Sequence, residues 1–235
     1  MRKRPSSSDR LLVLSTGNRA KARELRALLA GIPYRILDLS EFPSATPPAE
    51  GEVSYLENAL IKARAAAAST KALALADDSG LEVDALGGRP GVLSARYGGE
   101  GRSDADRCGV LLRELAGVPV ARRSARYRCA VAICSPEGVE ATAEGVVEGI
   151  ILEAPRGTGG FGYDPLFYCP ALGATFAELT PAAKDAVSHR GLAMAKARHI
   201  LLEWAGLQGG KAPAEDRAPR PGAPPARRRT PPRSS

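Results

Sequence analysis

The chain has 235 residues, of which 44% are hydrophobic, and a formal net charge of +7. This length suits one domain, or two lobes that share one sheet. No stretch approaches the roughly 18 apolar residues of a membrane-spanning helix. The apolar run Leu11–Leu14 behind the basic N-terminus is too short for a signal peptide. We therefore expect a globular protein of the cytoplasm, without a membrane segment.

The positive charge lies mainly at the two ends of the chain. Residues 1–10 carry a net +3 and residues 209–235 a net +5, which leaves −1 between them. Basic tails can make weak, non-specific contacts with nucleic acid, but their composition is more typical of solvated, disordered segments. We expect residues 1–10 and 208–235 to be disordered and residues 11–207 to form the folded domain.

The cysteines offer neither a disulfide framework nor a zinc site. None of the four forms a C-x-x-C pair, and neither histidine stands at a zinc-binding spacing from them. Packed, reduced thiols are expected, as in a cytoplasmic protein. The residues concerned are Cys108, Cys129, Cys134, Cys169, His189 and His199.

The predicted elements begin with a buried strand at Leu11–Leu14 and an amphipathic helix over residues 19–29. A Pro- and Glu-rich loop covers residues 41–53. Ser54 and Glu57 form a capping box that opens an alanine-rich helix reaching about residue 68.

The second half of the chain contains a long hairpin. Asp104 is predicted to cap a helix through residue 116, and Ser188 to cap a last helix that reaches Trp204. Because strands alternate with helices around a central hairpin, we expect an α/β fold with a mixed sheet. The hairpin strands cover residues 125–133 and 139–148, and a glycine-rich loop covers residues 153–165.

The most informative motif is a pair of adjacent carboxylates, Asp77 and Asp78, behind the apolar segment Leu73–Ala76. We expect a buried strand that ends at these carboxylates, with Ser79 and Gly80 in a turn. Successive strand residues point to opposite sides, so one carboxylate can face a site while the other braces a neighbouring loop. Oxygen ligands of this kind suit Mg²⁺, which also binds substrate phosphates. A polar turn without chemistry is the alternative.

A second candidate is Ser15-Thr-Gly-Asn-Arg-Ala-Lys21, where a strand leads through a turn into a helix. Helix N-termini present unpaired N–H groups and a partial positive charge, so they bind phosphate. Thr16 and Asn18 add donors, and Lys21 adds a charge for a polyphosphate. The P-loop pattern is absent, and an ordinary capped helix is the alternative.

An acidic loop, Glu50-Gly-Glu52, precedes the second helix. It can supply a second oxygen ligand to a metal held by Asp78. A solvated loop is the alternative, and for Glu52 it is the preferred one.

The stretch Gly157–Pro165 contains the letters G-x-G-x-x-G of a dinucleotide-binding fingerprint. That fingerprint must open a helix, whereas the residues that follow are typical of extended or turning chain. The glycines instead allow the backbone to approach a flat ligand closely. Phe161 and Tyr163 can pack against a base, and Asp164 can orient a neighbouring group.

Donors gather at Lys184, His189 and Arg190, at the start of the last helix. Such side chains can hydrogen-bond carbonyl or phosphate oxygens. Two cations beside the positive end of a helix are electrostatically unfavourable, which hints at an acceptor-rich ligand. A solvated helix N-terminus is the alternative.

Taken together, these segments resemble the inosine triphosphate pyrophosphatase family, the XTP/dITP diphosphatases that remove non-standard purine nucleotides. The resemblance covers about residues 11–207 in family order. It rests on Ser15–Lys21, Glu57-Asn-Ala-Leu-Ile-Lys-Ala63, Ala76-Asp-Asp-Ser-Gly-Leu81, Leu86-Gly-Gly-Arg-Pro-Gly91, Ser94-Ala-Arg-Tyr97, Gly159-Gly-Phe-Gly-Tyr-Asp-Pro165 and Lys184–Gly191.

The resemblance implies a homodimer of two-lobed α/β subunits on a long mixed sheet, with the active site in the cleft between the lobes. It implies Mg²⁺-dependent hydrolysis of a nucleoside triphosphate to the monophosphate and pyrophosphate. Asp78 matches the general base and, with Glu50, is expected to hold the metal. The substrate-binding residues implied are Thr16, Gly17, Asn18, Arg19, Ala20 and Lys21 for phosphates, Ser79, and, for the base, Phe161, Gly162, Tyr163, Asp164, Lys184, His189 and Arg190.

Two features depart from the family. Its usual Glu-Thr-Gly-x-Thr-Phe is Glu50-Gly-Glu-Val-Ser-Tyr55 here, and the basic tail has no recognised counterpart. A related pyrophosphatase for modified pyrimidine or methylated nucleotides is one rival interpretation. A nucleic-acid-binding module acting through its tails is another, and it predicts that deleting residues 209–235 abolishes function while Asp78→Asn does not.

Overall fold

The computed structural model describes residues 10–43, 45, 48, 51 and 54–207. Within them, one seven-stranded sheet has the order β2-β1-β3-β4-β5-β6-β7. The strands are β1 (Leu11–Leu14), β2 (Arg35–Asp38), β3 (Leu73–Val83), β4 (Ser124–Cys134), β5 (Glu140–Ile151), β6 (Phe167–Cys169) and β7 (Ala174–Thr175).

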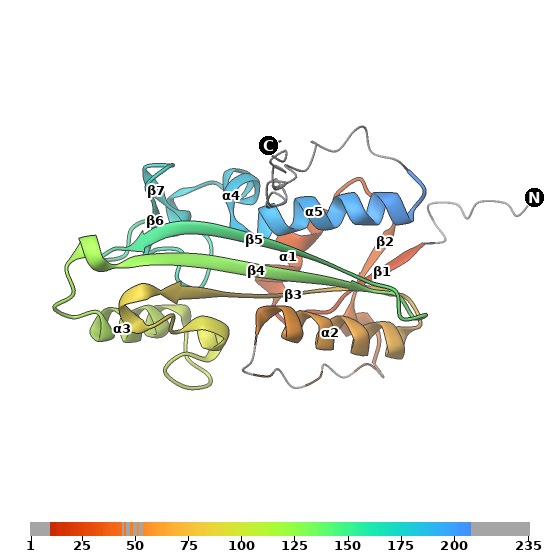
Figure 1. The fold of residues 1–235 in the computed structure, drawn as a ribbon, viewed down its shortest axis with the longest axis horizontal. Helices are drawn as coiled ribbons and strands as arrows, with labels where there is room; N and C mark the ends of the chain where they lie inside the picture. The colour runs from red at the N-terminus through yellow and green to blue at the C-terminus, as the bar shows by residue number, and fades with distance from the viewer. Residues whose placement is uncertain (1–9, 44, 46–47, 49–50, 52–53, 208–235) are drawn as a thin grey trace, which may run out of the picture.

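Helices cover both faces of this sheet. Figure 1 shows α2 and α3 along one face of the long central strands, with α4 and α5 on the other. The helices are α1 (Arg19–Leu28), α2 (Tyr55–Thr70), α3 (Asp104–Glu114), α4 (Pro181–Val187) and α5 (His189–Trp204).

The sheet is mixed, as the sequence predicted. Strand β1 pairs in parallel with β2 and β3, whereas β3, β4, β5, β6 and β7 pair in antiparallel succession. The predicted hairpin is the β4–β5 pair, which runs the length of the molecule (Figure 1). Because β3 to β5 cross from one end to the other, they connect the two lobes.

Each lobe has its own buried core. One lobe packs α1 and α5 on the sheet through residues such as Leu25, Leu75 and Leu201, and packs α2 on its other face through small residues such as Ala63. The other lobe has a hydrophobic core that includes Leu111 of α3 and Phe167 of β6. Polar side chains gather between these two cores, in the cavity described below.

Strand β3 is longer than predicted. It does not end at Asp77 and Asp78 but continues to Val83, so the prediction of a turn at Ser79 and Gly80 is wrong. The reason is its antiparallel pairing with β4 over its length, which places Asp77 opposite Val131 and satisfies the backbone N–H and C=O groups.

Two helix starts also differ from the predictions. Ser103, not Asp104, caps α3, because its side chain exchanges hydrogen bonds with Asp106 in a capping box. Lys184 does not lie at the start of the last helix but in α4, a separate short helix begun by the Thr180 cap and Pro181. The predicted Ser188 cap of α5 and Ser54 cap of α2 are both present.

The predicted loop over residues 153–165 is irregular backbone that leads into β6, so no helix follows its glycines. All four cysteines are free and buried. Burial raises the pKa of the Cys108 thiol to about 11, so it stays protonated near neutral pH. In the part of the chain described, no helix is long and apolar enough to cross a membrane.

Truncating a buried core side chain of β3 should lower the stability of the protein. Leu75 is fully buried against β4, so Leu75→Ala should lower the free energy of unfolding by about 2–5 kcal/mol through lost burial and a cavity. Leu172, which is 39% exposed, is the control, and Leu172→Ala should change it by less than about 0.5 kcal/mol. Urea titration measures both, and equal effects would contradict the packing described.

Candidate active site

A cavity of about 500 Å³ lies between the two cores. Its walls come from the loop after β1, from α2, from the middle of β3, from α3, from the loop before β6, and from α4 and α5. Most of the residues predicted from the sequence therefore meet in one place. Those that line it are Thr16, Gly17, Asn18, Ala20, Lys21, Asp78, Ser79, Phe161, Gly162, Tyr163, Asp164, Lys184, His189 and Arg190.

The loop after β1 forms one end of the cavity. Asn18 caps α1, because its side-chain oxygen accepts hydrogen bonds from the backbone N–H groups of Ala20 and Lys21. Thr16 in turn accepts a bond from the Asn18 N–H. Thr16 is half-buried and residues 17–19 are exposed. The turn presents the N-terminal end of α1, with Lys21, to the cavity. Arg19 is exposed and does not line the cavity.

Asp78 faces the cavity on the α2 side of β3 and is held at both carboxylate oxygens. Lys62 Nζ lies 3.1 Å from Oδ1, and Asn58 Nδ2 donates to Oδ2 at 3.0 Å. Asn58 also binds the backbone of Gly51 in both directions. The carboxylate is therefore oriented by two side chains of α2, which also bring the preceding loop to it.

Asp77 points to the opposite side of β3 and is completely enclosed. Its Oδ2 lies 3.3 Å from Lys21 Nζ and 3.2 Å from Arg190 Nε. Burial alone would raise the pKa of this carboxyl, but the charges of Lys21, Arg190 and Lys62 outweigh burial and lower it. Asp77 therefore remains ionised and holds two cavity-lining cations from α1 and α5.

A second carboxylate, Glu24 on α1, connects the cations of α4 and α5. Its Oε1 lies 2.9 Å from Lys184 Nζ and its Oε2 lies 2.6 Å from Arg190 Nη1. Arg190 also donates to the Ser79 hydroxyl at 2.8 Å. Each of these long side chains thus has a fixed geometry before any ligand arrives.

The loop before β6 is fixed by Asp164. This buried carboxylate accepts from the Phe161 N–H at 2.9 Å and from Lys184 Nζ at 2.6 Å. Burial raises its pKa, although the charge of Lys184 opposes the shift. Lys184 Nζ and Arg190 Cζ lie 4.5 Å and 5.5 Å from the Phe161 ring centre, within cation–π distance.

Tyr163 anchors this loop to the segment around Ser94. It is only 2% exposed, and its hydroxyl donates to the Ser94 carbonyl oxygen at 2.9 Å. Asp104 of α3 accepts from the Gly162 N–H at 2.7 Å. Of the two aromatic side chains in the loop, Phe161 is therefore the one that can offer a ring face to a ligand.

His189 is neutral, which changes the electrostatic interpretation of this helix start. Burial lowers its pKa well below the usual value, and the charges of Arg190 and Lys184 lower it further. Its ring stacks on Tyr127 at 4.5 Å, and its buried Nδ1 has no hydrogen-bond partner among the described residues. Only Arg190 is charged at the start of α5, and Asp77 and Glu24 neutralise it.

The described cavity is close to electrically neutral. Five cations line it, and each has a carboxylate partner, so a ligand with several negative charges needs further positive charge from outside this set. The cations are Lys21, Lys62, Arg107, Lys184 and Arg190, and the carboxylates are Asp77, Asp78, Asp104, Asp164 and Glu24.

The donor set fits a cation that relies partly on its substrate for ligands. In the described part of the chain, no group of three or more His, Cys, Asp or Glu side chains could hold a metal ion. Mg²⁺ is usually bound by one or two carboxylates together with substrate phosphates and water. Asp78 meets the first condition, whereas Glu50, the second predicted ligand, lies outside the described residues.

Several side chains of the site were not assigned a role from the sequence. Lys62, Asn58 and Glu24 lie on helices in ordinary polar or amphipathic surroundings, and Arg107 lies on α3. The available signal was the spacing of Asn58 and Lys62, four residues apart on one face of α2. Nothing local distinguishes Glu24 or Arg107 from a solvated residue.

The fold and cavity together define an α/β protein with a cleft that is lined by paired charged side chains and by an aromatic ring. The N-terminal end of α1 with Lys21 lies at the β1–α1 end, and the Phe161 ring with the donors Lys184 and Arg190 lies at the α4–α5 end. Comparison with known sequences makes this class specific. Residues 12–200 match the Ham1 family, and the chain belongs to it.

The relatives and solved structures agree. A dITP/XTP pyrophosphatase of Geobacter sulfurreducens is 51% identical over 84% of this chain and 98% of its own. One of Geobacillus kaustophilus is 48% identical over 87% and 98%. The structure of a HAM1 protein from Coxiella burnetii covers 83% of this chain and 99% of its own with a TM-score of 0.76 and 40% identity. These matches confirm the family resemblance and the mixed, two-lobed fold.

The buried charge of Asp77 predicts a pH-dependent stability. Asp77→Asn leaves Lys21 and Arg190 without their shared partner, so the free energy of unfolding should fall by about 3–5 kcal/mol at pH 7. Because the folded-state pKa is lowered, this stabilisation is present above the unfolded-state pKa of about 4 and is lost as pH falls through the folded-state value. The deficit of the variant should therefore shrink below pH 4.

Denaturant titrations from pH 7 to pH 3 measure this deficit. Asp84→Asn is the control, because Asp84 is paired with Arg126 at the surface with its side chain 44% exposed, and surface pairs contribute little. A deficit for Asp77→Asn that stayed constant through pH 3 would argue against the ionised, cation-paired state.

Proposed function

We propose that this protein hydrolyses non-standard purine nucleoside triphosphates (ITP, dITP and XTP) to the monophosphate and pyrophosphate, and so removes them from the nucleotide pool. The observation that carries the proposal is one cavity with phosphate donors at one end, donors around an aromatic ring at the other, and Asp78 between them. The relatives named dITP/XTP pyrophosphatases support the same reaction.

The phosphates bind at the loop after β1. The hydroxyl of Thr16 donates to phosphate oxygens, and Lys21 adds a positive charge whose position Asp77 fixes. The N–H groups of Ala20 and Lys21 bind the Asn18 side chain, so α1 contributes mainly the partial positive charge of its N-terminal end. Lys62 lies next to Asp78 and adds a second ammonium group toward the bond that breaks. These cations offset negative charge that develops on the leaving pyrophosphate.

Asp78 acts as the general base. One of its carboxylate oxygens takes a proton from water while the water oxygen bonds to phosphorus, and the bond between the α- and β-phosphates breaks. Asn58 and Lys62 hold the carboxylate in place, so its orientation does not depend on the substrate. No cysteine competes as nucleophile, since the thiols near the site, such as Cys108, stay protonated.

The base binds against Phe161. Lys184, His189 and Arg190 offer hydrogen bonds to the 6-oxo group of hypoxanthine or xanthine, whereas the 6-amino group of adenine is itself a donor and would face these donors without accepting from them. Glu24 and Asp164 hold Lys184, and Glu24 also holds Arg190. The ring of His189 is held by its stack on Tyr127, so all three donors are positioned in the free protein.

Enzymes of this family generally depend on a divalent metal, and we propose that Mg²⁺ serves here with Asp78 and Glu50 as ligands. The neutral cavity supports a metal requirement, because its own cations are already paired. Glu50 immediately precedes Gly51, which Asn58 ties to Asp78. When bound, the metal would offset phosphate charge.

We also propose that the protein is a homodimer and acts in the cytoplasm, following the family resemblance and the four free thiols. Among the rival functions, a pyrophosphatase for modified pyrimidines would lack a use for donors grouped around a purine's 6-position. A nucleic-acid-binding role for the tails would not require the cavity.

Pyrophosphate release tests the proposal directly. With Mg²⁺, the wild type should act strongly on ITP, dITP and XTP and weakly on ATP, GTP and dTTP. Asp78→Asn should reduce turnover of ITP at least about a hundredfold by removing the base, and chelation of the metal should abolish it. Chromatographic separation of each nucleoside triphosphate from its monophosphate provides the measurement, because it needs no metal-dependent coupling enzyme.

The matched control is Asp84→Asn, a carboxylate that directly follows β3 and lies outside the cavity, which should leave turnover unchanged. Equal turnover of all six nucleotides would refute the roles of Lys184, His189 and Arg190. Full activity of Asp78→Asn would refute its role as base. Retained activity after deletion of residues 209–235 would exclude the tail-dependent alternative.

A further inference from the structure

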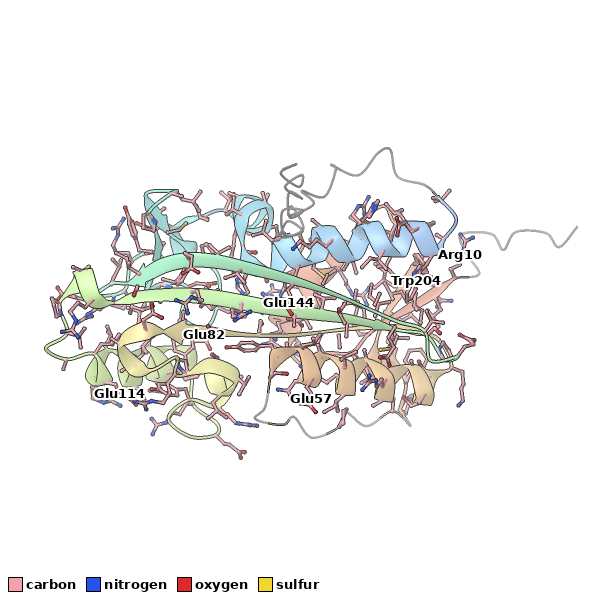
Figure 2. All side chains as sticks on the ribbon, viewed as in Figure 1. Arg10, Glu57, Glu82, Glu114, Glu144 and Trp204 are labelled. Carbon is pink, nitrogen blue, oxygen red and sulfur yellow. The ribbon has the colours of Figure 1, made fainter. Side chains whose placement is uncertain are left out.

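The first turn of α5 approaches β5 so closely that one strand position has no room for a side chain. A Cβ atom built on Gly145 would collide with the carbonyl oxygen of His189 and would lie 2.7 Å from the backbone nitrogen of Ala193. Both obstacles are backbone atoms of α5. Glu144, labelled in Figure 2, marks where β5 passes beside this turn.

Backbone conformation does not explain this glycine. Gly145 is absent from the glycines with positive φ, so other residues could adopt its extended backbone in β5. A glycine inside a strand weakens it, and its presence often marks a close approach of another backbone. The missing side chain at position 145 is therefore a packing requirement of α5.

The same turn is restricted on another side. Gly191, the third residue of α5, could not carry a Cβ either, because this atom would collide with the Asp185 carbonyl oxygen of α4. Ser188 ends α4 and begins α5, and its hydroxyl accepts a bond from the Gly191 N–H. The backbone of the turn is thus held between β5 and α4.

This turn carries two side chains proposed to read the base. His189 stacks on Tyr127 of β4 with an interplanar angle of 7°, and Arg190 binds Asp77 and Glu24. Both side chains are almost fully buried, so neither can reorient freely if its backbone moves. A displacement of the turn from β5 therefore moves the donors relative to Phe161.

We propose that Gly145 is a positioning residue for base selection: the absence of its side chain sets the depth at which the first turn of α5 sits on β5, and hence where His189 and Arg190 meet the base. This inference rests on the proposed function. It predicts a change in selectivity between 6-oxo and 6-amino purines rather than a uniform loss of activity.

The test compares Gly145→Ala with Gly149→Ala in the full chain. Gly149 lies on the same strand, and a Cβ there would come within 2.5 Å of Phe167 and 2.7 Å of the Tyr168 carbonyl oxygen, away from the backbone of α5. Both variants should lower the unfolding midpoint. Steady-state kcat and KM for dITP and dATP are measured for each variant and the wild type.

Gly145→Ala should lower kcat/KM for dITP about tenfold or more, because misplaced groups lose transition-state contacts. Turnover of dATP should change little, so the dITP-to-dATP ratio falls. Gly149→Ala should lower the ratio much less, because its Cβ reaches His189 only through the rings of Phe167 and Tyr127. The inference is overturned if Gly145→Ala keeps the wild-type ratio. No wild-type turnover of dITP would instead refute the proposed function.

If Gly145→Ala does not fold, a second pair of variants tests the same inference. Ala193 and Ala197 are both fully buried on α5, one turn apart, and glycine at either costs about 1 kcal/mol of helix stability. Ala193→Gly loosens the turn that faces Gly145 and should lower the dITP-to-dATP ratio. Ala197→Gly should not, and equal ratios for the two variants would overturn the inference.

Discussion

The site depends on one strand that carries two adjacent carboxylates to opposite faces of the sheet. Because β3 continues through Asp77 and Asp78, pairing with β4 fixes the backbone beneath both residues. Asp78 then faces the cavity beside Lys62, and Asp77 lies enclosed beside Lys21 and Arg190. A strand that ended at these two residues, as the sequence suggested, would not hold two carboxylates in such different environments.

The enclosed carboxylate organises the rest of the site. Asp77 and Glu24 together fix Arg190, and Glu24 and Asp164 together fix Lys184. The cations are therefore positioned and neutralised before substrate binds, so little rearrangement is needed on binding. The same pairing leaves the charge of a nucleoside triphosphate largely unbalanced by the described protein groups, which supports the proposed requirement for a divalent metal ion.

Features of the site that depend on local sequence were predictable, whereas features that depend on contacts between distant segments were not. The Asn18 cap, the Ser188 cap and the loop at Phe161 have local signatures in turn chemistry and glycine content. The extension of β3 depends on pairing with β4, which is distant in the chain. Glu24 looks like any solvated helix residue, and only the packing of α1 beside α5 brings it to the buried cations. The neutrality of His189 likewise follows from burial, which its own segment does not reveal.

The most direct test of the different roles of Asp77 and Asp78 is a calorimetric binding measurement in the absence of metal. The ligand is a dITP analogue with an imido bridge between the α- and β-phosphates. Asp78→Asn should bind it at least as tightly as the wild type, because a negative charge near the phosphates is removed. Asp77→Asn should bind it about tenfold more weakly, since Lys21 and Arg190 lose their fixed positions. Unchanged affinity in Asp77→Asn, with weakened affinity in Asp78→Asn, would contradict the account.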